Sequence, residues 1–304
     1  MVKIVMLGHT SAGKTTYVSL MYDTMRAGVE GFTLRTADPY HHRALSDAAD
    51  AIRRGRYPDV SHQRASYDLV LQHKGTDVFP FTWRDYRGGA LREKGADSAQ
   101  ARELHADLDD ADAIVLFADA QRLATAPVAA TEAATLVTHV MRAVARRGDD
   151  DGLLPVLVVF TKCDLVALTD ETASQLSAPF QQFLEGVNRS PSALGAMVGV
   201  SCGPSPVNLE LPVLTCLCVG LLSRVHTLDA LVRAYSERAE NLAARDTIGD
   251  RVTSWFKGEP SFAELAQRDF RQAREELARL QPLVEPSERL QAVIERAFDL
   301  ADDS

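Results

Sequence analysis

Short apolar runs alternate along this chain with longer segments in which apolar residues recur every three or four positions. The short runs predict β-strands, and those that are apolar throughout are typical of parallel strands buried on both faces. We expect strands at about 2–7, 67–73, 77–84, 112–118, 154–160 and 196–201. The longer segments predict helices at about 14–27, 97–107, 128–147, 170–187 and 211–243. This alternation predicts an α/β fold with a mostly parallel sheet and helices on both faces.

Two regions depart from the simple alternation. Residues 73–77 are few enough only for a hairpin, so we expect one antiparallel edge strand beside the parallel strands. Residues 28–66 hold no strong strand pattern, and we expect them to form a long irregular segment, a kind that is usually functional or mobile.

Beyond about residue 224 the pattern becomes helical and carries no further chemical motif. Ser261 and Glu264 have the spacing of a capping box and predict the start of one helix, and apolar residues at 290–298 mark another stripe. We therefore divide the chain into a motif-bearing domain, 1–224, and a helical extension, 225–304. The extension could dock on the first domain, form a helical hairpin or hold a partner, and intramolecular packing is the favoured interpretation.

Composition narrows the classes of function. The 304 residues carry a net charge of −9, which argues against broad binding to nucleic-acid phosphates or anionic lipid. The four cysteines have neither zinc-ligand spacing nor a disulfide framework, and no signal peptide is visible, so we expect a cytoplasmic protein. The apolar run 212–222 is shorter than the roughly 20 residues of a membrane span and predicts a buried helix, hence no stable membrane insertion.

The first chemical motif is the sequence G-H-T-S-A-G-K-T from Gly8 to Thr15, between the first strand and the first helix. This is the spacing of a P-loop, in which backbone N–H groups and the helix N-terminus form a cradle for phosphates. We expect Lys14 to reach the β- and γ-phosphates and Thr15 to offer its hydroxyl to Mg²⁺. The predicted nucleotide contacts of the loop are His9, Thr10, Ser11, Ala12, Gly13, Lys14, Thr15 and Thr16.

A second motif, D-x-x-G, begins at Asp85 and ends at Gly88. An aspartate at the tip of a strand beside the P-loop strand can hold Mg²⁺ through water, and a glycine lets its backbone N–H approach the γ-phosphate. By itself the motif is weak, since a surface turn has the same pattern.

Two further motifs point to a guanine base. Thr161-Lys162-Cys163-Asp164 follows the apolar strand at 154–160, and the Asp164 carboxylate can accept hydrogen bonds from two guanine donors that adenine lacks at those positions. Lys162 would lie along the base and ribose. Ser201 and Cys202 follow the last strand, where the Cys202 N–H can meet guanine O6. All four motifs stand at the carboxyl ends of predicted strands, where ligands of open parallel sheets bind.

Over about residues 1–205 these motifs resemble those of P-loop GTPases of the Ras-like, translation-factor-related class. More narrowly, residues 13–22 and 53–58 look like the bacterial double-GTPase family. The resemblance implies the Ras-like P-loop NTPase fold, GTP or GDP with Mg²⁺ as cofactors, and a magnesium-binding hydroxyl shortly before the second strand. Ser61 stands there, and Thr33 and Thr36 are weaker candidates.

The catalytic residues are harder to assign. The class commonly follows D-x-x-G with a glutamine that orients water, but here that residue is Gly89. We expect Lys14, Gly88 and Arg87 to act in catalysis. Arg84 or Arg92 could also serve as an arginine finger in cis, and His9 or His62 could position water.

The interpretation favoured by these motifs is a GTP-binding switch with slow, Mg²⁺-dependent hydrolysis. One alternative is a P-loop ATPase or nucleotide kinase, and another is a nucleotide-bound interaction protein that does not hydrolyse GTP. The expected partner is an effector or regulatory protein, such as a second GTPase or a second copy of the chain, and not a nucleic acid.

Overall fold

The computed structural model describes residues 2–36, 38–58, 65–86, 99–148, 152–167, 169–245 and 260–302. Contacts divide the chain into two compact units. The first comprises Met1–Gly220 together with Val293–Ser304, and the second comprises Leu221–Ala292. The domain boundary that we placed at 224 stays a prediction.

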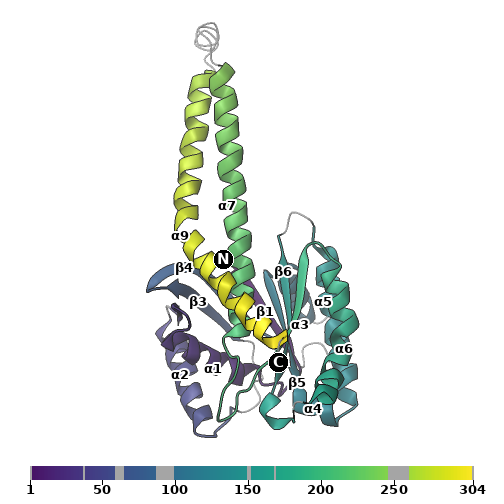
Figure 1. Cartoon of the computed structure of the whole chain (residues 1–304). Helices are drawn as coiled ribbons and strands as arrows, with labels where there is room; N and C mark the ends of the chain where they lie inside the picture. The colour runs from purple at the N-terminus through teal and green to yellow at the C-terminus, as the bar shows by residue number, and fades with distance from the viewer. Residues whose placement is uncertain are drawn as a thin grey trace. The chain divides into compact units, whose positions relative to one another are not determined.

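The first unit is built on a seven-stranded sheet in the order β2-β3-β4-β1-β5-β6-β7 (Figure 1). The strands are β1 (Val2–Gly8), β2 (Phe32–Thr36), β3 (Ala65–His73), β4 (Thr76–Asp85), β5 (Ala113–Asp119), β6 (Leu154–Thr161) and β7 (Ala193–Gly199). The pairs β4-β1, β1-β5, β5-β6 and β6-β7 are parallel, whereas β3 runs antiparallel to both β2 and β4. The predicted mostly parallel sheet with antiparallel pairing at one edge is confirmed.

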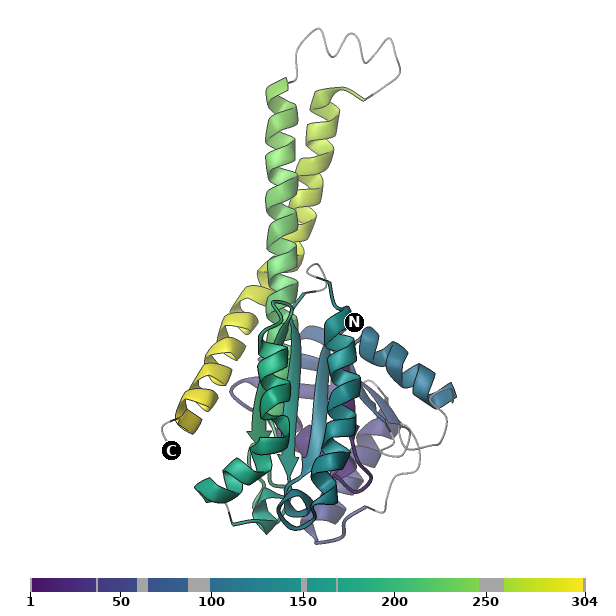
Figure 2. The ribbon, with the colours of Figure 1, turned by 90° about the vertical axis from the view of Figure 1, so that its right-hand side faces the viewer.

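Helices cover both faces of this sheet, as predicted. The helical elements are α1 (Lys14–Ala27), α2 (Pro39–Arg53), α3 (Ala99–Asp109), α4 (Ala120–Thr125), α5 (Val128–Arg146), the short 3₁₀ turn η2 (Cys163–Leu165), α6 (Asp170–Asn188), α7 (Leu211–Arg245) and α9 (Phe262–Asp302). Side chains alternate across each strand, so one set on β1, β5 and β6 packs against α3, α5 and α6. Figure 2 shows α5 and α6 side by side across that face. The other face carries α1 and the start of α7, where Tyr17 contacts Trp83 and Phe117.

The prediction that residues 28–66 form a long irregular segment is wrong. This region contains β2, which pairs with β3 at the edge of the sheet, and the helix α2. Asp38 caps α2 by accepting a hydrogen bond from the Tyr40 backbone N–H, and Pro39 occupies the first turn. The buried residues Leu45, Ala49 and Ile52 form a stripe too short and too mixed with polar residues to stand out in the sequence.

Other boundaries differ by smaller amounts. The last strand is Ala193–Gly199 rather than 196–201. The capping box is confirmed, because the Ser261 N–H donates to Glu264 at 2.9 Å and the Glu264 N–H donates to the Ser261 hydroxyl at 3.3 Å. The stripe at 290–298 belongs to the same helix, since α9 continues through Pro282 and Pro286.

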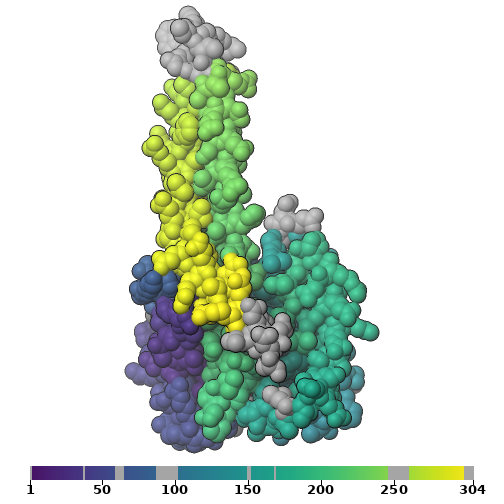
Figure 3. All heavy atoms as spheres, viewed as in Figure 1, coloured from purple at the N-terminus to yellow at the C-terminus, as the bar shows by residue number. Residues whose placement is uncertain are grey.

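The second unit is a helical hairpin made of the later part of α7 and most of α9. Arg238 lies 3.2 Å from Asp269, and the Arg245 guanidinium stacks over Phe262, so the two helices run antiparallel. Figure 3 shows their side chains packed along the hairpin.

One helix in the described part of the chain, α7, is long and apolar enough to span a membrane by length and composition. In this structure 56% of that apolar window is buried in protein. Val213, Leu214, Cys216 and Leu217 at its start are completely buried in the first unit, which confirms the predicted buried helix at 212–222. A core helix of this kind meets the same criteria as a span.

Candidate nucleotide-binding site

The P-loop closes tightly between β1 and α1. The Ala12 N–H donates to the His9 carbonyl at 3.1 Å, and Gly13 adopts the left-handed conformation with φ of 79°. A Cβ atom at Gly8 would lie 2.8 Å from the Phe117 carbonyl oxygen, so only glycine fits there. The loop therefore has the tight strand-to-helix turn that a phosphate cradle requires.

Lys14 lies inside this turn. Its ammonium donates to the carbonyls of Gly8 at 3.0 Å and His9 at 3.3 Å, and lies 4.0 Å from Asp85 Oδ1. Burial lowers the pKa of Lys14, and the nearby Asp85 carboxylate opposes this shift. The side chain is thus a cation held on replaceable carbonyl contacts at the mouth of the loop.

Asp85 is the second charged group at the phosphate side. Parallel pairing of β1 with β4 sets Met6 opposite Asp85 and brings the carboxylate to the P-loop. Burial raises the pKa of Asp85 to about 6, although Lys14 lowers it. Its Oδ1 is buried without a hydrogen-bond partner, which is unfavourable unless a ligand supplies one.

These residues fit a magnesium ion, because the buried Asp85 oxygen and the Thr15 hydroxyl are the hard oxygen donors that Mg²⁺ prefers. Of the other predicted site residues, Ser61, Arg87 and Gly88 lie outside the described residues, as do Gly89, Arg92 and His62. Thr33 and Thr36 do not meet the P-loop. They lie in β2, which β3 and β4 separate from β1.

Arg84, considered above as an arginine finger, points to the opposite face of the sheet from Asp85. It forms an ion pair with Asp107 of α3, whereas Asp85 faces Lys14 at the start of α1. Tyr86 donates its hydroxyl to the same Asp107 carboxylate. Successive residues of a strand alternate between faces, so Arg84 does not point at the phosphate site in this structure.

The base-recognition motif lies at the end of β6, two strands from β1. The Thr161 hydroxyl donates to the Ala12 carbonyl at 2.8 Å, which ties this motif directly to the P-loop. Lys162 is in the left-handed conformation, with φ of 60°, and its ammonium lies 2.5 Å from Asp119 Oδ2. Asp164 follows in the short 3₁₀ turn and is exposed.

The loop after β7 lies against this motif. Ser201 pairs with Val207 through two backbone hydrogen bonds of 3.1 Å, and Cys202 is buried. A Cβ atom at Gly203 would lie 2.4 Å from Asp164 Oδ2, so the loop backbone directly contacts the carboxylate. The structure therefore brings together the predicted base-binding residues of both segments, and their individual roles stay predictions.

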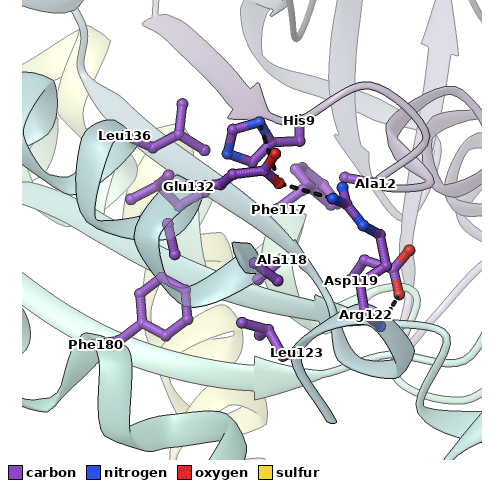
Figure 4. A pocket seen from close by; sticks show the side chains of 13 residues that line it. His9, Ala12, Phe117, Ala118, Asp119, Arg122, Leu123, Glu132, Leu136 and Phe180 are labelled. Carbon is purple, nitrogen blue, oxygen red and sulfur yellow. Dashed lines mark hydrogen bonds and ion pairs between the residues drawn. The ribbon is translucent and has the colours of Figure 1, made fainter. Parts of the chain in front are cut away.

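Three charged residues near the site were not predicted from the sequence: Asp119, Arg122 and Glu132. With His9 they line a cavity of about 20 Å³, which has room for a single water molecule. Figure 4 shows these side chains. Arg122 donates to the buried Glu132 carboxylate at 2.9 Å, and Glu132 lies 4.0 Å from His9 Nδ1. Asp119 ends β5, so the rule that ligands meet the carboxyl ends of parallel strands could have singled it out.

Comparisons with solved structures find small GTPases of low sequence identity. The Arl6 BBS3 small GTPase from Trypanosoma brucei, solved with bound GppNp, is 14% identical, with a TM-score of 0.40 over 71% of this chain and 95% of that one. The signal recognition particle receptor SRb-GTP/SRX complex from Chaetomium thermophilum is also 14% identical, with a TM-score of 0.40 over 66% and 91%. A comparison with curated protein sequences gave no significant match.

Comparison with known families matches residues 3–192, more than half of the chain, to Double-GTPase 2. The match covers the P-loop, Asp85 and the Thr161–Asp164 motif, whose geometry is described above. The chain is a P-loop GTPase and belongs to the Double-GTPase 2 family.

Proposed function

We propose that this protein binds GTP together with Mg²⁺, hydrolyses it slowly, and works as a switch between its GTP and GDP forms. The observation that carries this proposal is that the carboxyl ends of four adjacent strands, β4, β1, β5 and β6, bring the separate motifs together at one edge of the sheet. There β4 and β1 present Asp85 and the P-loop, while β6 presents Thr161 and Asp164. A nucleotide would place its triphosphate at the P-loop and Asp85, and its base at Asp164.

Guanine is the base that the exposed Asp164 carboxylate favours. A carboxylate is an acceptor only, and guanine offers it two donors, N1–H and the exocyclic amino group. The carboxylate lies against Gly203, where no side chain competes with the base for that space. Adenine offers no matching pair, which argues against the ATPase and nucleotide kinase alternatives.

The phosphate end is arranged for a charged ligand. Lys14 is held by two carbonyls that phosphate oxygens can replace with stronger, charge-assisted contacts. Thr15 and Asp85 would hold Mg²⁺, whose charge would stabilise the β- and γ-phosphate oxygens. Lys14 and the loop N–H groups would hold the phosphates at the start of α1.

Slow hydrolysis is expected from the residues at two positions of the chain. Gly89 has no side chain with which to orient water, and Arg84 is engaged by Asp107 on the other face of the sheet. An arginine supplied in trans typically accelerates such enzymes by about 10³- to 10⁵-fold. We therefore propose that an effector or regulatory protein in the cytoplasm, a second GTPase or a second copy of the chain, completes the site.

The test uses the purified full chain stripped of nucleotide. Calorimetric titration should show GTP and GDP binding at least tenfold tighter than ATP, and Mg²⁺ should strengthen GTP binding more than GDP binding. Equal affinity for GTP and ATP would refute the proposed base specificity. Single-turnover hydrolysis, measured at several protein concentrations, then distinguishes a slow GTPase from a protein that binds GTP without hydrolysing it. Gly89 and the Arg84–Asp107 pair favour the second alternative.

A further inference from the structure

The carboxylate of Asp119 has two separate contacts. Oδ1 accepts a hydrogen bond from the Arg122 backbone N–H at 3.0 Å and so caps α4, while Oδ2 lies 2.5 Å from the Lys162 ammonium. Asp119 is 7% exposed, so water competes little for either oxygen. The cap is local to α4, but the contact with Lys162 links the ends of two neighbouring strands, β5 and β6.

Lys162 needs such support. Its backbone is left-handed, a conformation that costs energy for a residue with a side chain, and lysine loses much rotamer freedom when its side chain is fixed. The side chain is about one-third exposed, so it would otherwise sample many positions in solvent. Asp119 instead fixes the ammonium at the end of β5, the strand next to β6.

We infer that Asp119 is a positioning residue for guanine nucleotide, acting through Lys162. This inference rests on the proposed function, in which the Lys162 stem lies along the base and ribose. A side chain that is ordered before the ligand arrives loses less entropy on binding, and this raises affinity without adding a contact to the ligand. A pair with one nearly buried member is also screened less by salt than an exposed pair.

The rival explanation is that Asp119 serves only as the cap of α4. Asparagine caps helices as well as aspartate does but carries no charge, so Asp119→Asn keeps the cap and removes the ion pair with Lys162. Asp119→Ser is a second cap-competent variant with a smaller side chain. The matched control is Asp38→Asn, because Asp38 caps α2 through a 2.8 Å hydrogen bond from the Tyr40 N–H and belongs to no part of the site.

The experiment is calorimetric titration of the full chain with GTP and GDP in Mg²⁺. Asp119→Asn and Asp119→Ser should weaken both nucleotides equally, by about tenfold or more, the usual worth of a hydrogen bond to a charged group. Both nucleotides share the base, so the ratio of their affinities should not change. Lys162→Met should have a similar effect, and Asp119→Asn should add little in the Lys162→Met background.

Two results would overturn the inference while leaving the proposed function intact. One is wild-type affinity in Asp119→Asn, matching Asp38→Asn. The other is a loss that persists in full when Lys162 is already methionine, which would leave Asp119 as a helix cap alone. If the unmodified protein binds neither GTP nor GDP, the proposed function fails and the inference fails with it. Circular dichroism melting of each variant identifies any loss that comes from unfolding.

Discussion

The ligand-free protein should lose stability as the pH rises through about 6, because Asp85 is buried where its charge is poorly solvated. The pKa of this carboxyl is about 6 in the folded protein, against an ordinary value of 3.8. Between these pH values the folded protein holds a proton that the unfolded chain has released, so the free energy of unfolding falls with rising pH. The contribution is fully present below about pH 4 and is lost above about pH 6.

The size of the effect follows from the shift. A difference of about two pKa units corresponds to about 3 kcal/mol, and this figure already includes the opposing effect of Lys14, 4.0 Å away, which stabilises the charged form. The Asp85 side chain is 9% exposed, so solvent screening reduces the figure little. For a protein of ordinary stability this is a large fraction of the total.

Denaturant unfolding at several pH values between 4 and 7.5 measures the effect in wild type and Asp85→Asn. The other titrating carboxyls, including Asp23 and Asp107 with their lowered pKa values, are common to both proteins and cancel in the difference. Wild type should lose up to about 3 kcal/mol more than Asp85→Asn across this range. Saturating Mg²⁺ and GTP should remove most of the difference, since a cation beside Asp85 stabilises its charged form. If the free energy of unfolding changed with pH by the same amount in wild type and Asp85→Asn, the reasoning would be refuted.

Five other variants test the remaining parts of the site. Asp164→Asn should weaken GTP binding by several kcal/mol, since each mismatched polar group costs about 1–3 kcal/mol, and should strengthen XTP binding in competition titrations. Gly203→Ala should weaken GTP binding without lowering the melting temperature, because its Cβ would displace the exposed Asp164 carboxylate. Lys14→Ala should remove most of the GTP affinity measured by calorimetry, and an unchanged affinity would show that the loop is not the site. Thr15→Ala should weaken Mg²⁺-dependent binding of GTP more than that of GDP. Arg84→Ala should leave the single-turnover rate of the isolated protein unchanged, and a large loss would mean that Arg84 reaches the phosphate after all.

The sequence predicts the buried part of the fold best. Strands such as β5 and β6 are apolar throughout because both of their faces are covered, and this makes them unmistakable in a single sequence. At the edge of the sheet the hydrophobic pattern no longer predicts the strand and the helix that form there. The strand β2 has only five residues and faces a single neighbour, and α2 presents just three buried side chains, so local polarity hides both elements.

The candidate site likewise contains residues that the sequence predicts and residues that only the structure reveals. The P-loop and the Thr161–Asp164 motif are linear patterns with fixed spacing, and they can be found without a structure. The hydrogen bond of the Thr161 hydroxyl cannot be predicted from such a pattern, because its acceptor, the Ala12 carbonyl, lies 149 residues earlier. Asp119 and Glu132 belong to no linear motif at all, and only the pairing of β5 with β6 and the packing of α5 reveal their contacts with Lys162 and Arg122.

The alternation of side chains along β4 also bears on catalysis. Asp85 faces the P-loop, while Arg84 and Tyr86, on either side of it, both contact Asp107 of α3. The alternation of side chains along the strand thus places Asp85 on the face of the P-loop and Arg84 on the face of α3. Arg84 therefore does not point at the phosphate site in this structure and is a poor candidate for an arginine finger. Arg87 and Arg92, which follow in the sequence, stay candidates in cis, and a second protein is a candidate in trans. A hydrolysis rate that rises with protein concentration would favour an arginine supplied by another copy of the chain. A rate that is independent of concentration but lost in Arg87→Ala would favour one supplied in cis.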